Sequence, residues 1–122
     1  MKKKAFFWTS IESISIPSNL VNLNEGWCLD TPHLKNIDVM PNNPLFITFD
    51  DGKFILAKSN KINANYNDLV IAKRDIKRAI IPSFIKTIRK GAFQKSYKLK
   101  CVKFFDDSEL QVIKSRAFNY SS

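Results

Sequence analysis

Residues 76–93 read IKRAIIPSFIKTIRKGAF, and this stretch decides the fold of the 122-residue chain. Its first part is typical of a β-strand, because Ala79 and Ile81 are two positions apart and therefore point to the same face. Pro82 ends that strand, since proline has no N–H group to donate to a neighbouring strand. From residue 85 to residue 93, apolar side chains recur every three to four positions, which indicates a turn or short helix that covers the core.

The same pattern recurs along the chain at fixed distances. Residues 11–39 match residues 76–104 at a spacing of 65 without a gap, so that Pro17 falls on Pro82. Within each of these segments the strand pattern repeats after 23 residues, and residues 110–118 continue it at a spacing of 25. The chain is therefore built from an internal repeat.

A unit of 23 residues is too short to bury its apolar edge alone, whereas stacked units bury it against one another. We therefore expect a solenoid of about five units, with parallel strands on one side and turns or short helices on the other. Residues 5–10 match residues 117–122 at a spacing of 112, so the chain begins and ends at the same phase of the repeat. We expect residues 1–122 to form a single array that is part of a longer one.

An insertion separates the two matching segments, because the strand starts are 42 residues apart there instead of 23. Apolar-rich runs flank Asp51-Gly52, a dipeptide that favours a type I′ turn, and they predict a β-hairpin. An Asn-rich loop follows, and residues 68–72 form a further predicted strand. We interpret residues 41–75 as a hairpin-bearing repeat of the same stack rather than as a separate domain.

Residues 76–93, followed by the strand pattern of Leu99, Val102 and Phe104, closely resemble the BspA-like leucine-rich repeat. Residues 10–18 are similar to trichomonad surface antigens of that family in particular. The resemblance implies an α/β leucine-rich-repeat solenoid with a parallel strand ladder on its concave side. It also implies a non-catalytic module for protein binding or cell-surface adhesion, with a host or cell-surface macromolecule as partner.

Side chains that alternate with the core positions of each strand are expected to face outward on the concave ladder. Leucine-rich repeats bind partners on such extended surfaces, so this face is the candidate partner-binding site. The candidate residues, which include two lysines beside the strands, are Ser13, Ser15, Asn36, Asp38, Lys77, Arg78, Ile80, Lys100 and Lys103. An ordinary solvated surface is the alternative interpretation of the same residues.

The chain carries 20 Lys and Arg residues against 11 Asp and Glu residues, a formal net charge of +9. This excess permits a polyanion, either a glycosaminoglycan or a nucleic acid, as an alternative partner. Nucleic acid is disfavoured, because Phe93, Phe104 and Phe118 fall on core positions of the repeat and so cannot stack on bases. Most of the charge is expected to lie on solvated positions.

The sequence predicts no catalytic, cofactor or metal site. Two Cys and one His are too few for a four-ligand zinc site. Cys28 is expected to be a buried core thiol and Cys101 an outward one, so no disulfide is predicted. The pair Cys28 and His33 lies within one repeat turn without an orienting group, and the Asp pairs at 50–51 and 106–107 are expected at turns.

The sequence leaves the localisation open, although the family resemblance suggests the cell surface. The apolar stretch after the charged start, residues 5–8, is shorter than the apolar core of a signal peptide, and no run is long enough to span a bilayer. We therefore expect neither an export signal nor a membrane span in the chain itself. Residues 119–121 fit an N-glycosylation sequon, which matters only in an exported protein.

Overall fold

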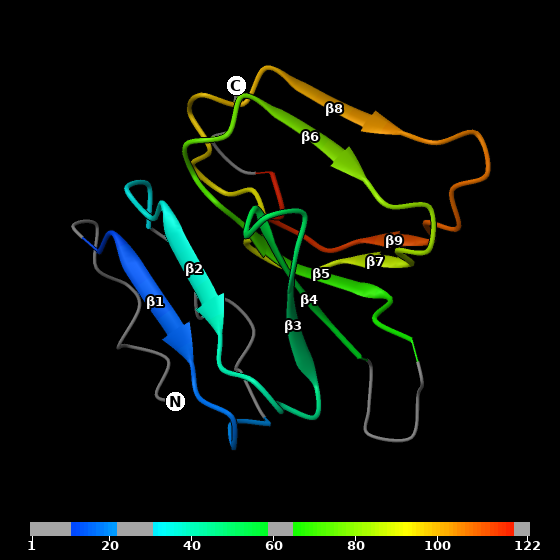
Figure 1. The fold of residues 1–122 in the computed structure, drawn as a ribbon. Helices are drawn as coiled ribbons and strands as arrows, with labels where there is room; N and C mark the ends of the chain where they lie inside the picture. Colours follow the sequence, from blue (N-terminus) through cyan, green and yellow to red (C-terminus); the bar gives the residue numbers. More distant parts are fainter. Residues whose placement is uncertain (1–10, 22–30, 59–64, 119–122) are drawn as a thin grey trace.

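The computed structural model describes residues 11–21, 31–58 and 65–118, and Figure 1 traces the chain through them. In these ranges the regular structure consists of nine β-strands, and no residue is helical. No segment in these ranges therefore forms a helix that is long and apolar enough to cross a membrane. The strands are β1 (Ser13–Ile16), β2 (Asn36–Val39), β3 (Phe46–Phe49), β4 (Phe54–Ala57), β5 (Asp68–Ala72), β6 (Arg78–Ile81), β7 (Thr87–Ile88), β8 (Cys101–Phe104) and β9 (Val112–Ile113).

Two parallel ladders, β1–β2 and β6–β8, repeat the same pairing along the chain. The backbone N–H of Asn36 donates to the carbonyl oxygen of Glu12 at 3.0 Å. At the equivalent position, 65 residues further on, the N–H of Cys101 donates to the carbonyl oxygen of Lys77 at 3.3 Å. The predicted solenoid of stacked coils with parallel ladders is therefore confirmed.

The opposite side of the stack contains short strands where the sequence predicts turns or short helices. β5, β7 and β9 pair in parallel, and they belong to a five-stranded sheet of order β3-β4-β5-β7-β9. The N–H of Thr87 donates to Asn67 at 3.3 Å, and the N–H of Lys114 donates to Ile88 at 2.9 Å. Because these groups bond to the neighbouring coil, they make none of the local bonds of a helix. Short helices are not confirmed, and the described part of the fold is all-β rather than α/β.

The predicted hairpin is present as the antiparallel pair β3–β4. Asp51 and Gly52 have φ values of 60° and 82°, which are the two positive values that a type I′ turn requires. The N–H of Lys53 donates to the carbonyl oxygen of Asp50 at 3.2 Å and closes the turn. β4 also pairs antiparallel with β5, and β5 has the bounds that the sequence predicts.

The core divides into two clusters, one beneath each parallel ladder. Ile16 is fully buried in the first cluster, and Ile81 and Phe93 are fully buried in the second. Phe93 stacks on Phe118 with 4.8 Å between the ring centroids, so both aromatic residues pack as core. The same prediction is wrong for Phe104, which is 44% exposed. In the described ranges β8 is the outer strand of its ladder, and no further coil covers it.

The two ladders are not continuous with each other. In the ranges described, β2 pairs only with β1 and β6 only with β8, and the hairpin β3–β4 lies between the ladders (Figure 1). The coils remain joined just before their strands, where the N–H of Arg74 donates to the carbonyl oxygen of Leu34 at 2.7 Å. The concave ladder that the sequence predicts as one surface is therefore two shorter surfaces.

The side chain of Arg74 links the two halves of the stack and is only 2% exposed. Its guanidinium donates to the carbonyl oxygens of Ala92 at 2.7 Å and Gly91 at 2.8 Å in the second half. It also donates to Oγ1 of Thr31, at 3.4 Å, in the first half. A buried guanidinium requires such hydrogen bonds in place of water. The contact therefore fixes how the two halves meet.

We predict that Arg74→Met lowers the free energy of unfolding by about 1–3 kcal/mol, because buried carbonyl groups lose their donor. Urea unfolding followed by circular dichroism measures the change. Arg78→Met is the matched control, because Arg78 is exposed on β6, and its effect should stay within about 0.5 kcal/mol. Equal stabilities of the two variants would contradict a structural role for Arg74.

Candidate functional site

The outer side of the first ladder is a row of small polar side chains. Residues alternate between exposed and buried along β1, whose isoleucines point inward. Ser13 lies opposite Asn36, whose Nδ2 donates to Ser13 Oγ at 3.3 Å, and Ser15 lies opposite Asp38. All four side chains are exposed. We call the outward side of β1, β2, β6 and β8 the ladder face.

The outer side of the second ladder combines positive charge with one large apolar side chain. Arg78 lies opposite Cys101, and Ile80 lies opposite Lys103. Arg78 and Lys103 are exposed, and Cys101 is a half-buried free thiol. Ile80 is 51% exposed, although the alternating residues of β6, Ala79 among them, are buried in the core. The exposure of Ile80 follows from the strand alternation and not from loose packing.

Two further predicted residues, Lys77 and Lys100, extend this positive charge. The N–H of Lys100 donates to the carbonyl oxygen of Lys77 at 2.8 Å, so the two lysines are neighbours before β6 and β8. Both are exposed, as are Arg78 and Lys103. None of the four makes an ion pair with another described residue. The structure thus places the nine candidates in two groups, a polar group that includes Asp38 and a basic group on the second ladder.

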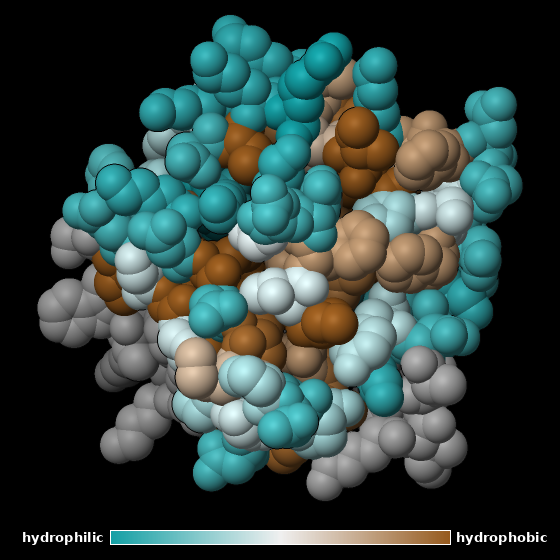
Figure 2. Space-filling model, viewed as in Figure 1, coloured by the Kyte–Doolittle hydropathy of each residue, from teal (hydrophilic) through white to brown (hydrophobic). Residues whose placement is uncertain are grey.

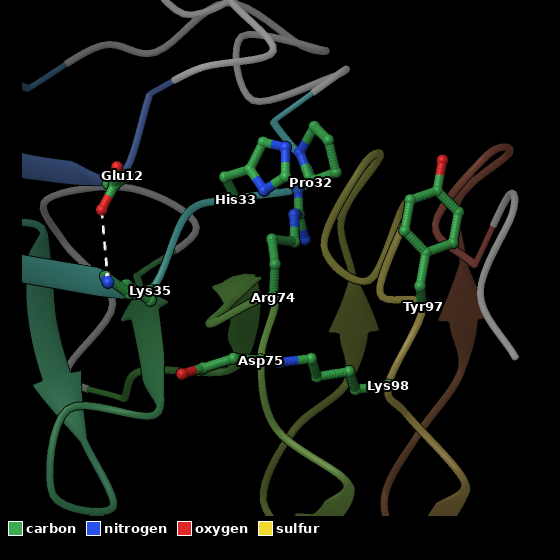
Figure 3. A pocket seen from close by; sticks show the side chains of 8 residues that line it. All are labelled: Glu12, Pro32, His33, Lys35, Arg74, Asp75, Tyr97 and Lys98. Carbon is green, nitrogen blue, oxygen red and sulfur yellow. Dashed lines mark ion pairs between the residues drawn. The ribbon is translucent and has the colours of Figure 1, made fainter.

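A cavity of about 560 Å³ lies where the two halves meet before their strands, and the sequence does not predict it (Figure 3). Lys35 Nζ lies 3.2 Å from Glu12 Oε1 on one side, while the Arg74 side chain points toward His33. The signal that could have identified it is the repeat, because positions 32, 74 and 97 share one phase at spacings of 42 and 65. The cavity is lined by Glu12, Pro32, His33, Lys35, Arg74, Asp75, Tyr97 and Lys98.

The remaining candidate groups form no catalytic arrangement in the part of the chain that the structure covers. Cys28 lies outside the described residues, as does the sequon at residues 119–121, and His33 is exposed at the cavity. Asp50 and Asp51 occupy the hairpin turn, as the sequence predicts. Between residues 11 and 118, leaving out the undescribed segments, no three His, Cys, Asp or Glu side chains are placed to hold a metal ion.

Comparison with known proteins places these observations in a family. The model of the BspA type leucine rich repeat region matches residues 1–122 in 6 copies. Among solved structures, the chain is similar to a leucine-rich repeat protein from Eubacterium ventriosum, with a TM-score of 0.76 and 21% sequence identity. That match covers 90% of this chain and 27% of the bacterial protein, so the chain spans about a quarter of its length. Comparison with curated proteins gives no significant match.

We predict that a cysteine in place of Ile80 reacts with a water-soluble maleimide at nearly the rate of the unfolded chain. The same substitution at Ala79 should react at least about tenfold more slowly, because its side chain is accessible only after local unfolding. Both variants need Cys28→Ser and Cys101→Ser as background. Labelling rates measured by mass spectrometry test the prediction, and equal native rates would contradict the inferred orientation of β6.

Proposed function

The chain belongs to the BspA-type leucine-rich repeat family, and we propose that it is a non-catalytic module that binds a protein partner through its ladder face. The observation that carries the proposal is Ile80, a 51% exposed apolar side chain next to the charged side chains of Arg78 and Lys103. Protein interfaces commonly combine an apolar anchor with a polar rim. The rigid stack of strands supports such a surface, because each outward side chain is held in register.

We further propose that the partner is displayed on a cell surface, so that the module acts in adhesion. The resemblance to surface antigens of the same family supports this more specific function. The polar half of the ladder face, with Ser13, Ser15 and Asn36, would supply hydrogen bonds around the anchor at Ile80. We also propose that residues 1–122 act as one array, in which residues 41–75 form the hairpin-bearing repeat.

The protein-binding proposal predicts that Ile80→Asp and Lys103→Glu each reduce binding of the labelled chain to cultured cells by about tenfold, because they disrupt the apolar anchor and its rim. Lys114→Glu is the matched control, since Lys114 is exposed beyond β9 and lies outside the ladder face. Flow cytometry measures the bound chain. Protease treatment of the cells should abolish binding, and binding that survives it would contradict a protein partner.

A polyanion partner is the second candidate, because Lys77, Arg78, Lys100 and Lys103 form a basic group without ion pairs among the described residues. Counterion release then predicts a slope of about −0.9 in log affinity against log salt for each phosphate neutralised, or about −3.6 for four. Titrations with heparin and with duplex DNA at rising salt measure the slope. A shallow slope, together with protease-sensitive cell binding, would reject the polyanion.

A further inference from the structure

A second apolar surface lies on the hairpin, away from the ladder face. Ile47 and Phe49 of β3 border a groove of about 310 Å³, and Leu56 of β4, Tyr66 and Phe84 complete its apolar lining. The rings of Phe49 and Phe84 meet edge to face at 5.9 Å. Figure 2 shows apolar side chains gathered across the middle of this view of the molecule. We call this feature the hairpin groove.

The groove contains more exposed apolar surface than the fold requires. Ile47 is 40% exposed and Phe49 is 37% exposed, whereas Leu56 is only 1% exposed. Both exposed side chains lie on the outer strand of the five-stranded sheet, where no described strand pairs beyond β3. Contiguous exposed apolar side chains of this kind are typical of interaction sites.

Two cations flank the groove next to Tyr66. Lys58 Nζ lies 5.1 Å from the centroid of the Tyr66 ring. The N–H of Lys86 donates to the carbonyl oxygen of Asn67, the residue after Tyr66, at 2.7 Å. Neither lysine makes an ion pair within the described ranges. An apolar floor with two uncompensated cations at its rim favours an aromatic segment that carries carboxylates.

Carboxylates of the hairpin tip do not supply this negative charge. Asp50, which follows β3, lies 4.0 Å from Lys53 and is compensated locally. Asp51 is exposed at the tip of the turn and does not line the groove. The charge that complements Lys58 and Lys86 must therefore come from elsewhere.

The chain itself exposes a segment with the required chemistry. Phe104 and Phe105 are 44% and 52% exposed, and they are followed by the exposed carboxylates of Asp106 and Asp107. Neither Asp makes an ion pair with a described residue. We call residues 104–107 the FFDD segment. Its exposure shows that it does not fill the hairpin groove of its own molecule.

The FFDD segment and the hairpin groove lie on neighbouring coils. The N–H of Glu109, two residues after the segment, donates to the carbonyl oxygen of Ser83 at 2.8 Å. Ser83 directly precedes Phe84, which lines the groove. Two surfaces this close in one molecule can both be used in a single two-fold contact, because a two-fold axis makes each contact twice.

We propose that two copies of the chain form a two-fold symmetric dimer in which the FFDD segment of each copy occupies the hairpin groove of the other. Phe104 and Phe105 contact the apolar lining, and Asp106 and Asp107 face Lys58 and Lys86. The contact is independent of the proposed function, because it uses neither Ile80 nor the basic group of the ladder face.

Sedimentation velocity over a dilution series of the full chain tests the proposal. The wild-type chain should pass from monomer to dimer as its concentration rises. Phe105→Ser should abolish the dimer, because the anchor is lost, whereas Ile80→Asp should leave it unchanged. A wild-type chain that stays monomeric throughout, or a dimer that survives Phe105→Ser, would overturn the proposal.

A charge-reversal pair tests the predicted contact with little risk to folding, since Lys58 and Asp107 lie at the surface. Lys58→Glu and Asp107→Lys should each raise the dimer dissociation constant by about tenfold or more, because like charges then meet. An equimolar mixture of the two variants should dimerise again, since both contacts of the mixed dimer join opposite charges. Circular dichroism checks that each variant is folded.

Asp51→Lys is the matched control, because it reverses an exposed carboxylate outside the FFDD segment. It should leave the dissociation constant within about twofold of the wild-type value. If Asp51→Lys weakens the dimer as much as Asp107→Lys, general charge governs association and the specific contact is wrong. Failure of the mixed variants to dimerise would likewise overturn the pairing.

Discussion

Backbone pairing between successive coils is the constraint on which the rest of this structure depends. A coil is too short to satisfy its own N–H and C=O groups, so these groups bond to the next coil along the stack. The carbonyl oxygen of Glu12 accepts from Lys35 and Asn36, and that of Lys77 accepts from Lys100 and Cys101. This pairing fixes which side chains of each strand point outward. The ladder face is thus a consequence of how the backbone is satisfied.

The inserted hairpin changes this arrangement, because it separates the two ladders while keeping the stack intact. The β4–β5 pairing continues the sheet on the far side, and the buried side chain of Arg74 holds the two halves together in front. One insertion therefore produces three surfaces: two ladder surfaces of different charge, the cavity between them, and the exposed outer strand β3. A regular array without the insertion would have a single continuous ladder instead.

The sequence predicts the local features of this fold well. The strands and the Asp51-Gly52 turn are recognisable because alternation and turn chemistry depend on adjacent residues. The exposure of Phe104 and the absence of helices in the described ranges are different, because they depend on what the neighbouring coil provides. The ladder candidates could be assigned to the outward side from alternation alone. The cavity and the hairpin groove could not, since they are formed by residues from separate coils.

The two exposed apolar surfaces differ in the kind of contact that they favour. Ile80 lies in a basic environment with no carboxylate opposite it on β8, so the second ladder favours an external partner. The hairpin groove has its complement in the same chain, since the FFDD segment supplies both aromatic rings and carboxylates. A dimer formed through the groove would leave both ladder faces open. Two ladder faces held in fixed geometry bind a repeated partner more tightly than either face alone, because the second contact becomes intramolecular. Self-association would in that way strengthen adhesion without any change in the ladder face itself.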